Sequence, residues 1–253
     1  MEPMGSLPGR IKYPRTPHLF GVKRASKAKT QDKVLGEEET VALLSRDNVN
    51  YVWENKVDGS NLGLSFEDDR LVIQNRGHVL GRGEHPQYDL LWPWTAIIKD
   101  CLRDLIQDKL VLFGEWCLAV HAIEYRSLPH WFMEFDVYDK QVGKFLDTPS
   151  RKEILRDAVS RGILAQVSVA KDARLTWQQA RELAYGQPSL FGEDKPEGLY
   201  LKVEKDGWVI DRAKVVRDEF IAKLVEDDVH WRSRPVRKQG LAPGVDILNP
   251  RIN

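Results

Sequence analysis

Short runs of apolar, β-branched and aromatic residues recur along the chain, and turn-forming residues bound most of them, which is the pattern of strands. The acidic stretch Glu67–Arg70 separates two of these runs and predicts a hairpin. The predicted strands are Tyr51–Trp53, Leu62–Phe66, Leu71–Gln74, Leu110–Cys117, Trp131–Asp139, Pro196–Glu204 and Gly207–Val216.

Apolar residues at helical spacing predict a few helices among these strands. The longest extends over Tyr88–Ile106, and Thr176 followed by Gln179 forms a capping box at the start of another. The other predicted helices are Glu37–Leu44, Ser150–Arg161 and Asp218–Val225, and the capped one is Thr176–Tyr185. Because strands follow one another with few helices between them, we expect an α+β fold of mostly antiparallel sheets rather than alternating βαβ units.

Composition places the chain among soluble globular proteins, since 42% of its 253 residues are apolar and 30% are charged. No apolar run is long enough to span a bilayer, and the N-terminus lacks the apolar core of a signal peptide. We therefore expect a cytoplasmic protein without a membrane partner. Cys101 and Cys117 form neither a disulfide framework nor a metal-ligand spacing, which fits a reducing compartment.

Charge is distributed unevenly, although the formal net charge is zero. A zero net charge argues against a nucleic-acid partner, whereas both ends of the chain are basic. The basic residues at the ends are Arg10, Lys12, Arg15, Lys23, Arg24, Lys27, Lys29 and Lys33, and then Arg232, Arg234, Arg237 and Lys238. These ends are either solvated, flexible segments or contacts for a phosphate backbone. Within the first of them, only Tyr13–Val22 is apolar enough to dock on a core.

Lys56 follows the apolar run Tyr51–Trp53 and precedes the turn-forming residues Asp58–Asn61. A lysine at the end of a strand, beside the N–H groups of a turn, becomes a nucleophile if its pKa falls. The alternative is a surface lysine next to a hairpin turn, and the motif alone does not separate the two.

Five further motifs follow Lys56 in a fixed order and decide between these alternatives. The six motifs are Lys56–Asn61, Arg76-Gly77, Gly114-Glu115, Phe135-Asp136, Glu197–Lys202 and Arg212–Lys214. In type and order they resemble those of the ATP-dependent RNA ligases, which belong to the covalent nucleotidyltransferase superfamily. One position departs from the pattern, because Arg212 stands where the family commonly has a lysine.

The resemblance implies a nucleotidyltransferase domain, the ATP-grasp-like adenylylation domain of ligases, with antiparallel sheets flanked by helices. We expect this domain to extend over residues 1–228, with a basic N-terminal segment 1–33, and a basic tail to follow over residues 229–253. Only about 35 residues follow the last motif, too few for an OB-fold domain. This shortage favours an RNA ligase over a DNA ligase or an mRNA capping enzyme.

Roles for individual residues also come from the resemblance. Lys56 would attack the α-phosphate of ATP, and Lys202 and Lys214 would be catalytic beside that phosphate. The implied nucleotide-binding residues are Glu54, Asn55, Arg76, Glu115, Phe135, Glu197, Lys202 and Lys214. Phe135 would stack on adenine, with Phe132 as the competing candidate. Glu197, with Asp58 nearby, would hold Mg²⁺ or Mn²⁺, since carboxylates suit such ions.

The function implied by the resemblance is ATP-dependent joining of RNA ends. The lysine takes AMP from ATP, AMP passes to an RNA 5′-phosphate, and a 3′-hydroxyl then displaces AMP. The substrate would be RNA with a 5′-phosphate and a 3′-hydroxyl, with an end-healing kinase or phosphatase as a possible partner. The alternatives are a minimal DNA ligase, a GTP-using capping enzyme, or an inactive nucleic-acid-binding subunit.

Overall fold

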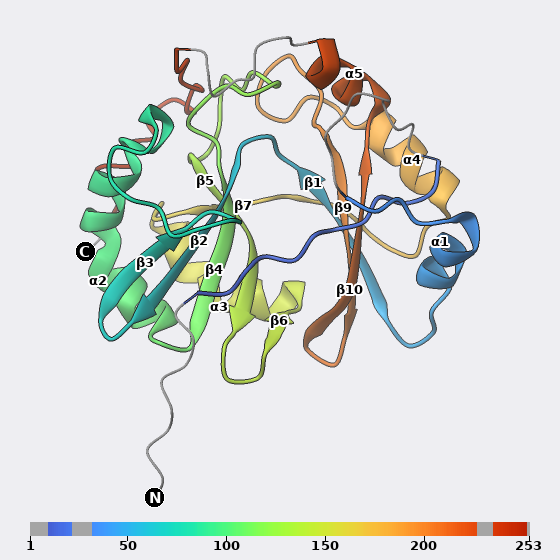
Figure 1. Cartoon of the computed structure of the whole chain (residues 1–253), viewed down its shortest axis with the longest axis horizontal. Helices are drawn as coiled ribbons and strands as arrows, with labels where there is room; N and C mark the ends of the chain where they lie inside the picture. Colours follow the sequence, from blue (N-terminus) through green and yellow to red (C-terminus); the bar gives the residue numbers. More distant parts are fainter. Residues whose placement is uncertain (1–9, 22–31, 227–234, 252–253) are drawn as a thin grey trace, which may run out of the picture.

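The computed structural model describes residues 10–21, 32–226 and 235–251 of the chain. Its strands form one strongly curved sheet in the order β3-β2-β4-β5-β6-β10-β9-β1-β8, with β7 beside β5 (Figure 1). The strands are β1 Asn50–Lys56, β2 Ser60–Glu67, β3 Arg70–Gln74, β4 Leu110–Trp116, β5 Phe132–Asp139, β6 Lys144–Leu146, β7 Ala165–Gln166, β8 Val169–Asp172, β9 Gly198–Lys205 and β10 Trp208–Val216.

Strand pairing is antiparallel except between β5 and β7, which confirms the predicted α+β pattern. The helices are α1 Glu37–Leu44, α2 Leu91–Ile106, α3 Thr148–Ser160, α4 Trp177–Gly186 and α5 Asp218–Glu226, with a short 3₁₀ helix at Pro86–Tyr88. Each predicted helix is present within a few residues of its expected ends, and the Thr176 capping box is formed as predicted. The short strands β6, β7 and β8 were not predicted.

The strands on either side of Lys56 belong to different parts of the sheet. β1 pairs with β8 and β9, whereas β2 pairs with β3 and β4. The alternative of a lysine beside a hairpin turn is therefore wrong, because β1 and β2 do not pair. Residues 57–59 instead carry the chain from one half of the sheet to the other.

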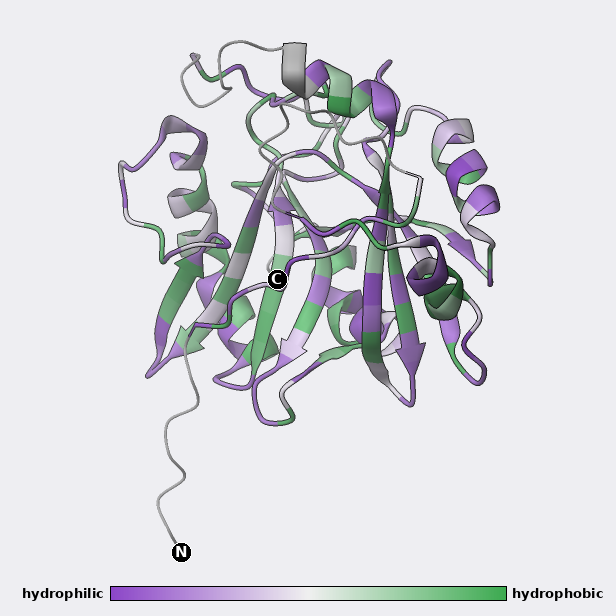
Figure 2. Ribbon diagram, turned by 45° about the vertical axis from the view of Figure 1, so that its right-hand side comes forward, coloured by the Kyte–Doolittle hydropathy of each residue, from purple (hydrophilic) through white to green (hydrophobic). Residues whose placement is uncertain are grey.

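Each half of the sheet has its own hydrophobic core. Trp94 and Ile98 of α2 pack with Leu64 of β2 under one half, and Trp53 packs with Leu201 under the other. Figure 1 shows α2 beside the first half and α1 and α4 beside the second. Hydrophobic and hydrophilic residues alternate along several strands (Figure 2), although the middle of β1, β2 and β9 is buried on both faces. Among the described residues, no helix combines the length and the apolar character that crossing a bilayer requires.

Two segments from the ends of the chain pack onto this framework. Residues 10–21 run across the face of the sheet, and His18 bridges to Lys214 of β10 (Figure 1). Residues 235–251 pack against the loop after β4 and bury Ile247. The predicted basic tail therefore includes a segment that is packed on the domain. Residues 1–9, 22–31 and 227–234, which hold several of the basic residues, lie outside the described part.

Candidate active site

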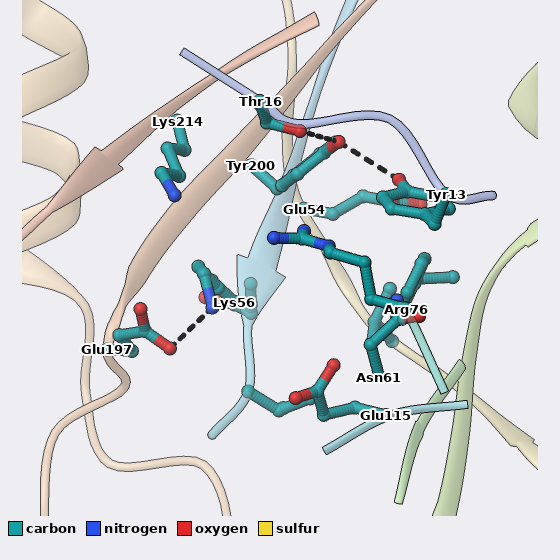
Figure 3. Close-up of a pocket in the computed structure, with 14 residues that line it drawn as sticks. Tyr13, Thr16, Glu54, Lys56, Asn61, Arg76, Glu115, Glu197, Tyr200 and Lys214 are labelled. Atoms are coloured by element: carbon teal, nitrogen blue, oxygen red, sulfur yellow. Dashed lines mark hydrogen bonds and ion pairs between the residues drawn. The ribbon is translucent and has the colours of Figure 1, made fainter. Parts of the chain in front are cut away.

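A cavity of about 330 Å³ opens where the two halves of the sheet meet. Side chains from both halves and from the N-terminal segment line it (Figure 3). The lining residues are Tyr13, Thr16, Glu54, Asn55, Lys56, Val57, Asn61, Arg76, Glu115, Phe135, Val167, Glu197, Tyr200 and Lys214. The structure thus brings together seven of the eight residues predicted to bind a nucleotide, together with Lys56.

Lys56 ends β1 with its amine inside this pocket, and its Nζ lies 2.5 Å from Oε2 of Glu197. Glu197 stands just before β9, whose first residue, Gly198, pairs with Lys56. A side chain at Gly198 has no room, because a Cβ there would lie 1.9 Å from the carbonyl oxygen of Val215. The glycine after Glu197 therefore lets β9 approach β10 closely and brings the carboxylate to the lysine.

Carboxylates dominate the electrostatics of Lys56. Burial lowers its pKa, but the charges of Glu197, Glu115 and Asp58 outweigh burial and hold that pKa above its ordinary value. Lys56 is thus an ammonium group at neutral pH in this state. Lys214 behaves in the opposite way, because burial and the nearby charge of Lys56 lower its pKa. The pKa is therefore lowered at Lys214 and raised at Lys56.

Lys214 and Arg76 supply positive charge to the opening of the pocket. The Lys214 ammonium lies 2.6 Å from Oδ2 of Asp32, a carboxylate from the N-terminal part of the chain. The guanidinium of Arg76 points into the pocket (Figure 3), and its Nε has no hydrogen-bond partner within the described ranges. The two cations therefore face a space suited to an anion. In this structure the carboxylate of Asp32 is the anion that Lys214 binds.

Lys202, predicted to be catalytic, does not line the pocket. Its buried Nζ lies 2.9 Å from Oε2 of Glu54 and 3.0 Å from Oδ1 of Asp136. A further set of ion pairs extends this cluster, from Arg151 to Glu54 and Glu134 and from Arg212 to Asp136. We call these six residues the buried ion network: Glu54, Glu134, Asp136, Arg151, Lys202 and Arg212. The geometry favours a structural role for Lys202 over a contact with a phosphate.

Glu54 belongs to both arrangements, since it lines the pocket and pairs with Arg151 and Lys202. Its carboxylate is therefore largely occupied by cations of the buried ion network. Asn55 keeps one unpartnered polar atom. Its Nδ2 donates to Oγ of Ser168 at 3.0 Å, whereas its Oδ1 has no partner in the described part of the chain. The Oδ1 of Asn61 is likewise unpartnered there, so the pocket presents two buried amide acceptors.

Three hydroxyl groups on one wall were not predicted as site residues. The hydroxyl of Tyr13 donates to Oδ2 of Asp136 at 2.5 Å and lies 2.9 Å from that of Tyr200, which lies 2.6 Å from Oγ1 of Thr16 (Figure 3). Because Tyr13 has one proton, Tyr200 must donate to Tyr13 and Thr16 to Tyr200. Thr16 is left with acceptor lone pairs, whereas Tyr200 accepts from Thr16 and bonds to Arg212. The sequence indicated only that Tyr13–Val22 could dock.

Phe135 lines the pocket, with its ring 5.3 Å from that of Tyr13 in an edge-on contact. Phe132, the competing candidate, is fully buried against Trp94 and does not line the pocket. Glu115 lies in the lining, and burial, opposed by the charge of Lys56 and reinforced by those of Glu197 and Asp58, raises its pKa to about 8.

Asp58 is directed away from the pocket lining. Its Oδ2 accepts hydrogen bonds from the backbone N–H groups of Ala122 and Ile123, at 2.8 and 2.9 Å. Within the described residues, no cluster of three histidine, cysteine or acidic side chains could hold a metal alone. Glu197, Glu115 and Asn61 still offer the oxygen atoms that Mg²⁺ or Mn²⁺ prefers, provided that a ligand and water complete the coordination. The role predicted for Asp58 at a metal stays a prediction.

Comparisons with known proteins point to one group. A family model described as RNA ligase matches residues 49–225. An RNA ligase of Naegleria gruberi solved with pyrophosphate has a TM-score of 0.59 and 20% identity, over 89% of this chain and 64% of that one. A variant of that ligase with ATP and Mn has a TM-score of 0.57 and 19% identity, over 74% and 54%. No curated protein matched the chain.

These structural likenesses show a shared fold. The chain spans 64% of the length of the ligase chain solved with pyrophosphate and 54% of that of the variant. The matched residues 49–225 contain all six motifs, whereas Tyr13 and Thr16 of the pocket and the packed segment 235–251 lie outside them.

Proposed function

Because the chain belongs to the RNA ligase family, we propose that it joins RNA ends in an ATP-dependent reaction that passes through a lysyl-AMP intermediate. The observation that carries this proposal is the amine of Lys56, 2.5 Å from Glu197 in a pocket that also presents Lys214 and Arg76. A nucleophilic amine, a carboxylate and two cations facing one cavity are the groups that transfer of a nucleotidyl group to a lysine requires.

In the first step the nitrogen of Lys56 bonds to the α-phosphorus of ATP while the bond from that phosphorus to pyrophosphate breaks. The ammonium must first lose a proton, and Glu197 is within hydrogen-bond distance to receive it. Lys214 and Arg76 would offset the charge that grows on the phosphate oxygens, and a phosphate there would take the place of Asp32 at Lys214.

A divalent cation, Mg²⁺ or Mn²⁺, supplies positive charge beside the phosphates when it is bound. Glu197 of the same lining would hold it through its carboxylate oxygen atoms, and water and phosphate oxygens would complete the coordination. A cation at Glu197 offsets the negative charge that raises the pKa of Lys56, so occupation of the site favours the neutral amine.

The nucleoside would occupy the part of the pocket lined by Phe135 and Glu115. Phe135 would stack on adenine and Glu115 would bind the ribose, as the family resemblance implies. The unpartnered Oδ1 atoms of Asn55 and Asn61 and the acceptor lone pairs of Thr16 suit the hydroxyl and amino groups of adenosine, which donate hydrogen bonds.

In the later steps AMP moves from Lys56 to the 5′-phosphate of an RNA, and the 3′-hydroxyl of the other end attacks that phosphate and releases AMP. The basic residues at the ends of the chain would contact the RNA backbone. The proposal includes an end-healing kinase or phosphatase that prepares such ends, and a cytoplasmic location.

The test is a joining assay with purified full-length protein, ATP and Mg²⁺. Substrates with a 5′-phosphate and a 3′-hydroxyl are presented as a nicked duplex, a broken stem-loop and a single strand, in RNA and in DNA, with 5′-hydroxyl RNA as the matched control. Joining of phosphorylated RNA alone supports the proposal. Equal joining of DNA would identify a DNA ligase, transfer from GTP a capping enzyme, and nucleic-acid binding without joining an inactive subunit.

A further inference from the structure

Residues 117–131, the loop between β4 and β5, contain no helix or strand of their own. A loop of this length has a defined shape only when other segments hold it. Two segments do so. The carbonyl oxygen of Phe191 accepts from the backbone N–H groups of Arg126 and Ser127, and the C-terminal segment pairs with the loop at residues 119 and 128.

This loop in turn holds the residue two positions after Lys56. The hydroxyl of Tyr125 accepts a hydrogen bond from the backbone N–H of Asp58 at 2.8 Å. The Asp58 carboxylate accepts two more, from Ala122 and Ile123. Three hydrogen bonds thus attach the turn that links the two halves of the sheet to a loop that has no regular structure.

Gln239 of the C-terminal segment fastens the same part of the loop. Its Oε1 accepts from the backbone N–H of Tyr125 at 2.6 Å, and its Nε2 donates to the carbonyl oxygen of Ile123 at 2.8 Å. Its own backbone N–H donates to the carbonyl oxygen of Leu118 at 2.8 Å. The side chain is buried, and its amide offers the acceptor and the donor that these two groups require.

Close packing leaves the loop little freedom to shift. A Cβ at Gly240 would lie 2.6 Å from the carbonyl oxygen of Arg126, and a Cβ at Gly59 would lie 2.7 Å from that of Trp116. The C-terminal segment therefore lies directly against the loop backbone, and the turn after Lys56 lies against the last residue of β4, where the loop begins.

We propose that Gln239 is a positioning residue for the adenylylation of Lys56. It fixes the backbone at residues 123–125, this backbone holds Asp58, and Asp58 sets where the strand carrying Lys56 ends relative to Glu197. The inference rests on the proposed function. It extends the machinery to a segment outside the family match, because Gln239 lies beyond residue 225.

The test compares three full-length variants with the wild type: Gln239→Glu, Tyr125→Phe and Tyr51→Phe. Tyr51→Phe is the matched control, because Tyr51 is as buried as Tyr125 and its hydroxyl also bonds to backbone, but to the carbonyl oxygens of Leu43 and Arg46. The single-turnover rate of lysyl-AMP formation is measured against ATP concentration, and each melting temperature is recorded.

We expect Gln239→Glu and Tyr125→Phe to lower the maximal rate by about 10- to 100-fold with little change in the half-saturating ATP concentration, because a misplaced nucleophile slows chemistry and not binding. Tyr51→Phe should keep the wild-type rate. A rate near wild type in both folded variants, or an equal loss in Tyr51→Phe, would overturn the proposal. If Gln239→Glu does not fold, the maximal rates of Tyr125→Phe and Tyr51→Phe are compared instead.

Hydrogen exchange provides a readout that does not depend on activity. The amides of Asp58, Ala122 and Ile123 should exchange faster in Gln239→Glu than in the wild type, and Tyr51→Phe should leave them unchanged. Unaltered exchange in Gln239→Glu would contradict the proposal even if the rate fell. A wild-type protein whose amides are protected from exchange, as in a folded protein, but which forms no lysyl-AMP would instead overturn the proposed function. The role of Gln239 in adenylylation would fall with it.

Discussion

Two residue pairs of the β9–β10 ladder, separated by the pair Leu201–Ala213, carry cations with very different surroundings. Tyr200 pairs with Lys214, and both side chains line the pocket. Lys202 pairs with Arg212, and both of these cations are buried with Asp136. Residues two apart on a strand share a face, so the same face of the ladder lines the pocket at one of these pairs and belongs to the scaffold at the other.

The difference lies in how completely each charge is paired within the protein. Burial lowers the pKa of Lys214, whose ammonium pairs with one carboxylate among the described residues, that of Asp32. Lys202 has two carboxylates within 3.0 Å, and those carboxylates also pair with Arg151 and Arg212. A cation with few carboxylate partners inside the protein, such as Lys214, is available to a phosphate. A buried cation with two such partners, such as Lys202, links strands of the scaffold.

Replacement of Lys214 should have the largest effect on activity. Lys214→Met is expected to slow lysyl-AMP formation by about 10²–10³-fold, because it removes a charge that faces the α-phosphate. The free energy of unfolding should change little, since burial already disfavours this charge. Single-turnover labelling and urea unfolding measure the two effects, and a stable, fully active variant would break the comparison.

Replacement of Lys202 should have the opposite profile. Lys202→Met leaves Glu54 and Asp136 short of a cation and is expected to lower the free energy of unfolding by about 3–5 kcal/mol. Urea unfolding beside Lys214→Met gives the matched comparison. If Lys202→Met keeps wild-type stability and loses lysyl-AMP formation, Lys202 acts on the phosphate as the sequence predicted.

Tyr13 links the two regions, because its hydroxyl contacts Asp136 of the buried ion network and Tyr200 of the pocket. Tyr13→Phe is expected to lower the free energy of unfolding by about 1–3 kcal/mol, since it removes a buried donor. It should also weaken ATP binding, because the hydroxyl of Tyr200 loses its acceptor. A Tyr51→Phe protein that weakens ATP binding equally would show that the link to the pocket is not specific.

Replacement of Glu115 should give an effect of a different kind, one that depends on pH. Its pKa rises from an ordinary 4.5 to about 8 in the folded protein, so between these values the unfolded chain binds fewer protons and stability falls as pH rises. Glu115→Gln removes this loss. The melting temperature of the variant relative to wild type should therefore increase from pH 5 to pH 8 and then level off. A difference that is constant with pH would contradict the raised pKa.

Local patterns were sufficient for much of the fold. The helix at Glu37–Leu44 and the hairpin of β2 and β3 depend on nearby residues, and both were predicted. The two-residue strand β7 was not, because its parallel pairing with β5 joins distant segments. The packing of residues 235–251 was also missed, since it depends on backbone hydrogen bonds to a loop far away in sequence.

The site shows the same limit. The motif order identified Lys56 and Glu197, which the structure places 2.5 Å apart. The motif also assigned Lys202 to the phosphate. The structure pairs Lys202 with Glu54 and Asp136 instead. Partners of a buried charge are set by tertiary packing, which spacing along one strand does not reveal.

The most direct test of the account is covalent labelling of the folded, AMP-free protein with α-labelled ATP and Mg²⁺, followed by denaturation. We expect the wild-type polypeptide to carry label, and acid but not alkali should release this label, as for a phosphoramidate. We expect no label on a folded Lys56→Ala protein and none from GTP. Label that persists in Lys56→Ala, or a wild type that takes no label, would contradict Lys56 as the nucleophile.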